Sequence, residues 1–397
     1  MKKYIRSERA NLFEPNVYIS MIVKLSGDLQ SEEIEQAVQK AYEANEATMS
    51  KIVLEENGDV YYEKMGSSGC KFIIDSCPWK KLLHQSEKRP FALNEGELVR
   101  TFFTKEKDQL VLFIHAHHLV GDGQSVLILL NDIVNSMNKQ SLTYKPMLSI
   151  GRNFLEKRAK LTAGTKLYIK RLNQKWKKNA RVFTWDDYYA IHRKYWNEYV
   201  SEIEWKTYDI KELKAGCPKG ITINSYIITK LLRAHPECEV VGIPVSVRED
   251  KGMSNQTSGV AIKYKYNCKR TFEVNANRVH KVIYKKLKNR HMKYFILLFM
   301  ERLCPSLIDA VLLQSHGCCQ NKLTEKMAKV MGYTGDGGRD IGVTNLNKIS
   351  IQNLYERFVV EDIMFVPPKV SYAKKVVGIS TYADTLTLCN HKMVREA

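Results

Sequence analysis

The sequence predicts an α/β protein made of two lobes. Apolar and polar residues alternate over residues 17–25, and apolar residues then recur at helical spacing over 34–41. The same order of strand and helix returns at residues 110–134. Between residues 151 and 205 a basic run and an aromatic cluster replace this pattern, without a Pro/Gly-rich linker. We therefore expect a first lobe at residues 1–165 and a second at 166–397, with a bridge at about 150–205.

The composition is that of a globular protein. The chain has 397 residues, of which 44% are hydrophobic and 26% charged. No apolar run approaches the roughly 18 residues of a membrane span, and no signal-peptide core follows the first charges. The nine cysteines include no Cys-x-x-Cys pair. We expect a cytoplasmic protein with reduced thiols and no transmembrane segment.

The first lobe is predicted to begin with the strand at 17–25. A Gly27-Asp28 turn follows, and Ser31 is the expected N-cap of the next helix. Residues 51–62 predict a hairpin that turns at Asn57-Gly58.

The most informative segment follows the apolar strand at 110–116. It reads His117, His118, Leu119, Val120, Gly121, Asp122, Gly123, and an apolar helical pattern begins at 126. A strand that delivers an imidazole into a loop suits proton transfer near neutral pH, where histidine titrates.

This spacing, His-His-x-x-x-Asp-Gly, resembles the active-site motif of the superfamily of condensation domains and CoA-dependent acyltransferases. That superfamily includes chloramphenicol acetyltransferases, alcohol acetyltransferases, polyketide-associated acyltransferases and the condensation domains of peptide synthetases. The resemblance implies a chloramphenicol acetyltransferase-like fold, with two mixed-sheet lobes and an active-site tunnel between them. It also implies a thioester-dependent acyltransferase of secondary metabolism, acting on a hydroxyl or amine acceptor.

The resemblance assigns roles to the motif residues. His118 becomes the general base, and no covalent enzyme intermediate is needed. His117 packs and hydrogen-bonds on the other side. Asp122 is expected to be structural and to pair with Arg248, and Gly123 to adopt a backbone conformation that a side chain would oppose. Thr344, Asn345 and the backbone near Gly123 are candidates for stabilising the oxyanion.

Segments of the second lobe support the same resemblance. Residues 221–232 predict a helix, 240–248 a buried strand that ends in Arg248, and 378–388 the last hairpin. Residues 342–346 resemble the family's Ser/Thr-Asn-x-Gly segment, in which Asn347 replaces the glycine. The glycine-rich residues 332–338 lack the Lys-Ser/Thr of a P-loop and are expected to form a loop near the tunnel.

The net charge of the chain indicates which kinds of partner it can bind. The formal charge is +19, and residues 152–181 hold eleven Lys/Arg against one acid. Such a run favours an anionic partner, either the phosphates of acyl-CoA, an acidic acyl or peptidyl carrier protein, or an anionic membrane surface touched peripherally. Nucleic acid is not expected, since no nucleic-acid-binding motif accompanies the charge.

Several alternatives remain at this stage. The additional motifs of peptide-synthetase condensation domains are absent, which favours a free-standing member nearer to bacterial alcohol acyltransferases. Acyl-CoA is the expected co-substrate, no cofactor is expected to be permanently bound, and a carrier-protein thioester is the alternative donor. A non-catalytic binding or scaffold role is the third possibility. A metal site at His115 and His117 is disfavoured, because no nearby acid other than Asp122 completes a ligand set.

Overall fold

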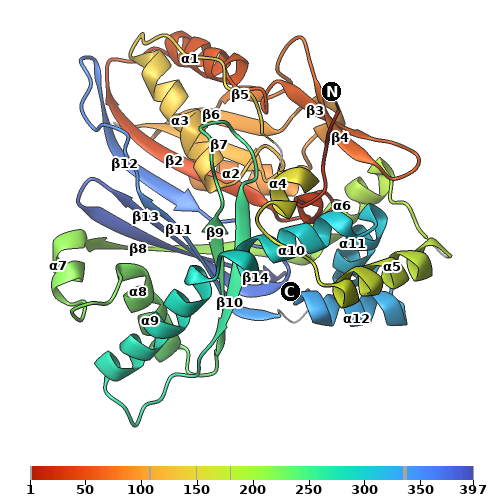
Figure 1. The fold of residues 1–397 in the computed structure, drawn as a ribbon. Coiled ribbons are helices and arrows are strands. Elements are labelled where there is room, and N and C mark those ends of the chain that lie inside the picture. Colours follow the sequence, from red (N-terminus) through yellow and green to blue (C-terminus); the bar gives the residue numbers. More distant parts are fainter. Residues whose placement is uncertain (1, 107–108, 149, 179, 334–337, 397) are drawn as a thin grey trace.

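The computed structural model describes residues 2–106, 109–148, 150–178, 180–333 and 338–396. Two mixed sheets, each covered by helices, lie one above the other in Figure 1 and correspond to the two predicted lobes. Residues 334–337 of the glycine-rich segment lie outside the described residues.

The first lobe is built on a mixed sheet whose central strand carries the histidine motif. Two helices, α1 (Ser31–Glu43) and α3 (Gly123–Met137), pack against each other over this sheet. Nearly the whole motif strand is buried, as its apolar sequence predicts. The described strands of the sheet are, in order, β12 (Phe358–Val366), β2 (Tyr18–Gly27), β7 (Gln109–His117), β6 (Val99–Glu106) and β5 (Lys71–Ile74).

A small antiparallel sheet completes the first lobe. The predicted hairpin at residues 51–62 is confirmed, with Gly58 at φ 84° in its turn. Ser31 is not the N-cap of α1; that position belongs to Gln30, which forms a capping box with Glu33. The remaining elements are β1 (Lys3–Tyr4), β4 (Val60–Lys64), β3 (Ser50–Leu54), the helix α2 (Trp79–Lys88) and the 3₁₀ turns η1 (Arg9–Asn11) and η2 (Leu93–Glu95).

The second lobe is built on a larger mixed sheet. Its strand β11 runs parallel to both of its neighbours, and helices α8 (Ile223–Ala234) and α9 (Phe272–Lys288) pack on one face. The described strands are β10 (Thr257–Lys263), β9 (Val240–Ser246), β11 (Arg339–Lys348), β13 (Ala373–Tyr382), β14 (Thr385–Arg395) and β8 (Tyr199–Asp209).

The bridge and the segment before β11 are helical. Here α5 packs beside α12, with the Tyr168 hydroxyl 3.6 Å from the Met327 sulfur. The elements are α4 (Arg152–Glu156), α5 (Ala163–Lys177), α6 (Trp185–Glu198), α7 (Ile210–Ala215), α10 (Arg290–Arg302), α11 (Pro305–Leu313), η3 (Gln314–His316) and α12 (Lys322–Met331).

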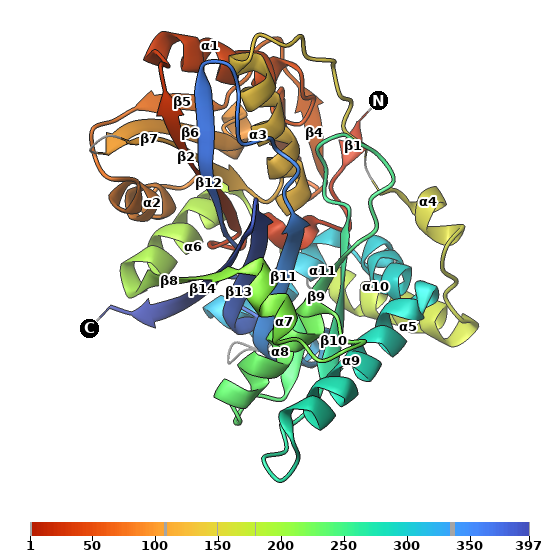
Figure 2. The ribbon, with the colours of Figure 1, turned by 90° about the vertical axis from the view of Figure 1, so that its left-hand side faces the viewer.

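One strand crosses the division expected between residues 165 and 166. β12 leaves the second lobe and pairs with β2 at the edge of the first sheet, as Figure 2 shows. Side chains of α10, α11 and α12 also join the core of the first lobe. A single boundary is therefore too simple, because the C-terminal half of the chain contributes to both lobes.

Candidate active site

The histidine motif ends a buried strand and begins a helix. His117 is the last residue of β7, where it pairs with Tyr18 of β2. The backbone N–H of His118 donates to the carbonyl of Val17 at 3.0 Å, which fixes the start of the loop. Asp122 is the N-cap of α3, with its carboxylate accepting from the N–H of Ser125 at 3.0 Å. The helix therefore begins at the motif itself, three residues before the apolar pattern that predicts it.

The two histidines lie in different environments. His117 is fully buried, and its Nδ1 accepts from the Leu119 N–H at 3.2 Å. Burial, with the charge of His118, lowers the pKa of His117 to about 3, so its ring stays neutral. His118 instead lines a cavity of about 760 Å³ between the lobes.

Asn255 holds the ring of His118 in one orientation. Its amide Nδ2 donates to the His118 carbonyl at 2.6 Å, so its Oδ1 is the atom that lies 2.8 Å from Nδ1 of the ring. Since an amide oxygen can only accept, Nδ1 carries the proton and Nε2 holds the free lone pair. No hydrogen bond to Nε2 is found among the described residues. Burial lowers the pKa of His118.

Asp122 and Arg248 join the two lobes. Nη2 of Arg248 lies 2.6 Å from Oδ1 of Asp122, so the predicted pairing is present. Oδ2 of the same carboxylate accepts from the Gln256 N–H at 3.1 Å and from the Thr257 hydroxyl at 2.8 Å. Both carboxylate oxygens of Asp122 thus have partners, and the carboxylate links the start of α3 to the second lobe.

The prediction that Gly123 adopts a backbone conformation opposed by a side chain is wrong. Gly123 does not have a positive φ; within the motif that conformation belongs to Gly121, at φ 151°. A Cβ on Gly123 would instead meet Cδ2 of Leu346 at 2.7 Å. The glycine permits the second lobe to approach α3 closely, where the side chain of Gln124 also donates to the Leu346 carbonyl at 3.2 Å.

The floor of the cavity is a face of the second sheet on which three glycines lie. Side chains cover two of them, Arg339 at Gly242 and Val376 at Gly342, whereas a Cβ on Gly259 would meet no atom within 4 Å. Side chains alternate between the two faces of a strand, and the neighbours of Gly242, Gly342 and Gly259 pack against α8 and α9. The three glycines therefore lie on the other face of the sheet, where they line the cavity. Thr344 shares this face, whereas Oδ1 of Asn345 already accepts from the Asn347 N–H at 2.7 Å. Asn347 has φ 62°, so the asparagine that replaces the family's glycine adopts a left-handed conformation.

Residues near the N-terminus also line the cavity, and no sequence pattern predicts them as site residues. Glu8 directly precedes η1, and Asn11 is its last residue. Both line the cavity, and Nδ2 of Asn11 lies 3.4 Å from Nδ1 of His118. Asn255, Asn11 and Glu8 belong to no pattern that marks a site. Only the tertiary fold brings them to His118.

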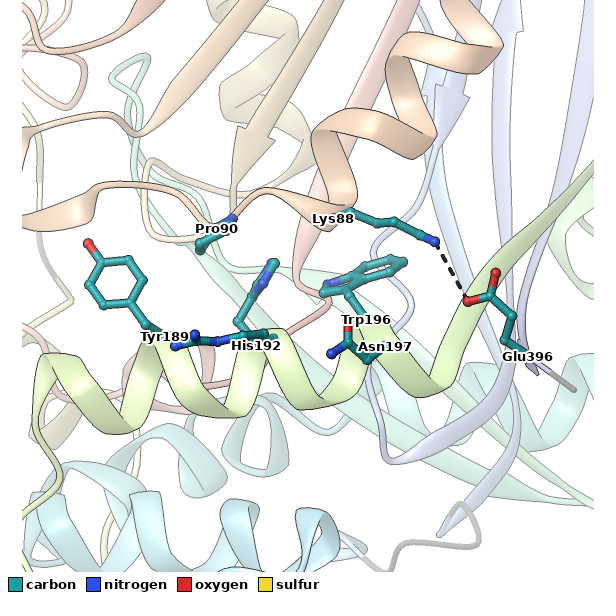
Figure 3. A pocket seen from close by; sticks show the side chains of 8 residues that line it. Lys88, Pro90, Tyr189, His192, Trp196, Asn197 and Glu396 are labelled. Atoms are coloured by element: carbon teal, nitrogen blue, oxygen red, sulfur yellow. Dashed lines mark ion pairs between the residues drawn. The ribbon is translucent and has the colours of Figure 1, made fainter.

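A second hollow lies apart from the predicted site residues. This smaller hollow has a volume of about 440 Å³. Figure 3 shows it between α6 and the end of α2, bordered by His192, Trp196 and the ion pair of Lys88 with Glu396. None of the predicted site residues lines it.

Among the described residues, no group of three or more His, Cys, Asp or Glu side chains is placed to hold a metal ion. None of the helices in the same part of the chain combines the length and the apolar composition of a membrane span.

Comparison with known proteins agrees with the motif. The family model of the Condensation domain matches residues 11–206, which include the histidine motif. A search of curated protein sequences found no significant match.

Solved structures extend the likeness to the second lobe. A mutant of the starter condensation domain of rhizomide synthetase RzmA, in complex with C8-CoA and Leu-SNAC, aligns with a TM-score of 0.63 at 9% identity, covering 98% of this chain and 88% of the other. Polyketide synthase associated protein 5 from Mycobacterium tuberculosis aligns with 0.63 at 13%, covering 99% and 94%. The trichothecene 15-O-acetyltransferase TRI3 from Fusarium sporotrichioides aligns with 0.63 at 11%, covering 98% and 90%. At these identities the likeness establishes the two-lobed fold.

Proposed function

We propose that this chain, whose residues 11–206 match the family model of the Condensation domain and whose fold resembles condensation domains and an O-acetyltransferase, transfers an acyl group from acyl-CoA to a hydroxyl or amine acceptor. His118 is the general base, and no cofactor is permanently bound. The observation that carries the proposal is the hydrogen bond of Asn255 to Nδ1 of His118, which leaves Nε2 free to accept a proton beside the cavity.

The reaction follows from this geometry. Nε2 of His118 takes the proton as the acceptor oxygen or nitrogen attacks the thioester carbonyl. The tetrahedral intermediate then collapses, the C–S bond breaks, and the thiolate of CoA recovers the proton from the imidazolium. No serine or cysteine nucleophile takes part, because the cavity brings donor and acceptor together directly. Thr344, on the cavity face of β11, is our preferred hydroxyl donor to the oxyanion.

The cavity wall carries two cations that suit a phosphate-bearing donor. Arg339 and Lys348, the first and last residues of β11, line it. A pantetheine arm ends in phosphate, so a cation beside the cavity favours this donor. The bound C8-CoA of the rhizomide synthetase domain is consistent with this class of donor.

Thiol release tests the proposal. The protein is given acyl-CoA donors of short to long chain with pooled alcohols and amines, and free thiol is followed. His118→Ala should lower acceptor-dependent release by about 10²–10⁴-fold. His235→Ala, which removes an exposed imidazole that does not line the cavity, is the matched control. Full activity of His118→Ala would end the assignment of the base.

A carrier-protein donor is the second candidate. Helix α5 carries five Lys/Arg and no acid, and Lys166, Lys170 and Arg171 are exposed on it. Such a face favours an acidic carrier domain. If an acyl carrier protein is the true donor, turnover with it should fall steeply with salt, while turnover with acyl-CoA at saturation should change little. Ligand binding without turnover from either donor would instead favour a non-catalytic role.

A further inference from the structure

We infer that Glu8 selects an acceptor that carries a positive charge, such as a primary ammonium group, in addition to its nucleophile. The inference rests on the proposed function, because it names the acceptor class of the same site. It is drawn from the placement of Glu8, from the lack of an ion pair between its carboxylate and any described residue, and from the other groups of the cavity wall.

Glu8 lines the same cavity as the proposed base. It directly precedes η1, and Asn11, three residues later, lies 3.4 Å from the His118 ring. A 3₁₀ turn rises about 2 Å per residue, so the backbones of Glu8 and Asn11 are separated by roughly 6 Å along the turn. Glu8, Asn11 and His118 all line the same cavity. An acceptor whose nucleophile is at His118 can therefore place a second group near Glu8.

The turn that carries Glu8 is firmly anchored. Nε and Nη2 of Arg9 donate to the two carboxylate oxygens of Asp309 on α11, at 2.8 and 2.6 Å, and both side chains are buried. A paired, two-point contact of this kind fixes direction as well as distance. Glu8 is thus presented to the cavity by a rigid support.

The carboxylate of Glu8 is bonded by neutral donors of its own segment. It accepts from the Ser7 hydroxyl at 2.9 Å, and the backbone N–H groups of Arg6 and Glu8 also favour its ionised form. It does not cap η1 although it occupies the N-cap position. No ion pair of Glu8 is found within the described part of the chain. The other carboxylate of the described cavity wall, Asp122, is occupied by Arg248, Gln256 and Thr257.

The surroundings disfavour a bare negative charge on Glu8. Apolar side chains of α10, Ile296, Leu297 and Met300, line the same cavity. Burial, together with the nearby carboxylate of Glu301, raises the pKa of Glu8 to about 7. A bound cation would restore the ionised form by supplying the partner that the protein does not. This arrangement recognises an ammonium group rather than a second anion.

A homologous series of acceptors tests the inference. Turnover is measured with α,ω-amino alcohols of three to six carbons and with the alkan-1-ols in which CH₃ replaces NH₃⁺. We expect wild-type kcat/KM to favour the amino alcohol by about tenfold or more at one chain length. Glu8→Gln, which keeps the shape and removes the charge, should bring that preference to near one. Glu35→Gln, at an exposed position on α1, is the matched control and should retain the preference.

A binding measurement separates the two proposals. His118→Ala protein, with and without Glu8→Gln, is titrated with 1,4-diaminobutane in a calorimeter. At least tenfold weaker binding in the double variant supports the role of Glu8 even if no donor gives turnover, in which case the proposed transfer reaction alone fails. Equal binding in both proteins, or an amino-alcohol preference that survives Glu8→Gln, would overturn the inference. Unfolding curves of each variant verify that the fold is intact.

Discussion

Nη2 of Arg248, in the second lobe, lies 2.6 Å from Oδ1 of Asp122 in the first, although the two residues are 126 positions apart in the sequence. Both side chains are mostly buried, at 13% and 6% exposure. The same Asp122 oxygen caps α3 through the Ser125 N–H. One carboxylate thus fixes the start of the helix after His118 and the docking of the opposite lobe.

Substitution of Asp122 can separate these two tasks. Asparagine is a good N-cap but carries no charge, so Asp122→Asn should leave Arg248 without its ionic partner and lower the free energy of unfolding by about 3 kcal/mol. Asp122→Ala, which also removes the cap, should cost about 1 kcal/mol more. Urea unfolding at constant pH measures both differences. If Asp122→Asn were as stable as the wild type, the pair would not hold the lobes.

Asn255 should matter for turnover more than for stability. Asn255→Ala frees the His118 ring to take either tautomer and either orientation, and loss of such an orienting partner typically costs about 10- to 100-fold. We expect that loss in kcat, measured by thiol release, with KM for the acyl-CoA donor nearly unchanged. A change confined to KM would assign Asn255 to donor binding instead.

The pH profile reports the ionisation of His118. The base must be neutral, and burial lowers its pKa below the ordinary 6.5. With an uncharged alkan-1-ol as acceptor, whose binding does not depend on the charge of Glu8, the kcat/KM value should therefore stay level as the pH falls through 6.5 and decline only at lower pH. Asn255→Asp places a negative charge beside Nδ1, which favours the imidazolium, so the decline should move to higher pH. A wild-type decline that began above pH 6.5 would contradict this environment for the base.

Gly259 offers a way to block the cavity without disturbing the fold. A Cβ on this residue would meet no atom within 4 Å, and the residue lines the cavity. Gly259→Leu should fill space meant for the substrate and lower kcat/KM by at least about tenfold, while the free energy of unfolding changes by less than about 1 kcal/mol. Gly66→Leu, another open position that does not line the cavity, is the control. Undiminished turnover in Gly259→Leu would place the substrate elsewhere.

The sequence predicts the motif well because its signals are local. Strand β7, the histidines and the helix that follows form one continuous segment, and the resemblance supplies Arg248 as the partner of Asp122. Gly123 is different, because its surroundings are set by a residue far away in the sequence. A side chain at this position would collide with Leu346, 223 positions later, and no local pattern reveals that contact. The same holds for Asn255, whose importance depends on a loop folding back onto His118.

The lobe boundary illustrates a related limit. Nothing in the local sequence of β12 tells which sheet this strand joins. Its edge position beside β2 is set by the tertiary fold, as is the packing of α10 to α12 against the first lobe. Periodicity reports which face of an element is buried, and it carries no information about the partner that buries it.

His192 gives a pH-dependent stability that can be isolated. It is buried, 2.7 Å from the Tyr18 hydroxyl, and burial with the charge of Arg100 lowers its pKa to about 3. In the unfolded chain the imidazole binds a proton below about pH 6.5, and in the folded protein it does not until about pH 3. The unfolded state therefore holds more protons in this window, and the free energy of unfolding must fall as the pH drops.

His192→Gln keeps a polar group near Tyr18 but does not titrate. Between pH 6 and 4 the wild type should lose stability relative to this variant by about 1.4 kcal/mol per pH unit. Parallel curves for the two proteins, from urea unfolding at several pH values, would mean that His192 is protonated as readily in the folded chain as in the unfolded one.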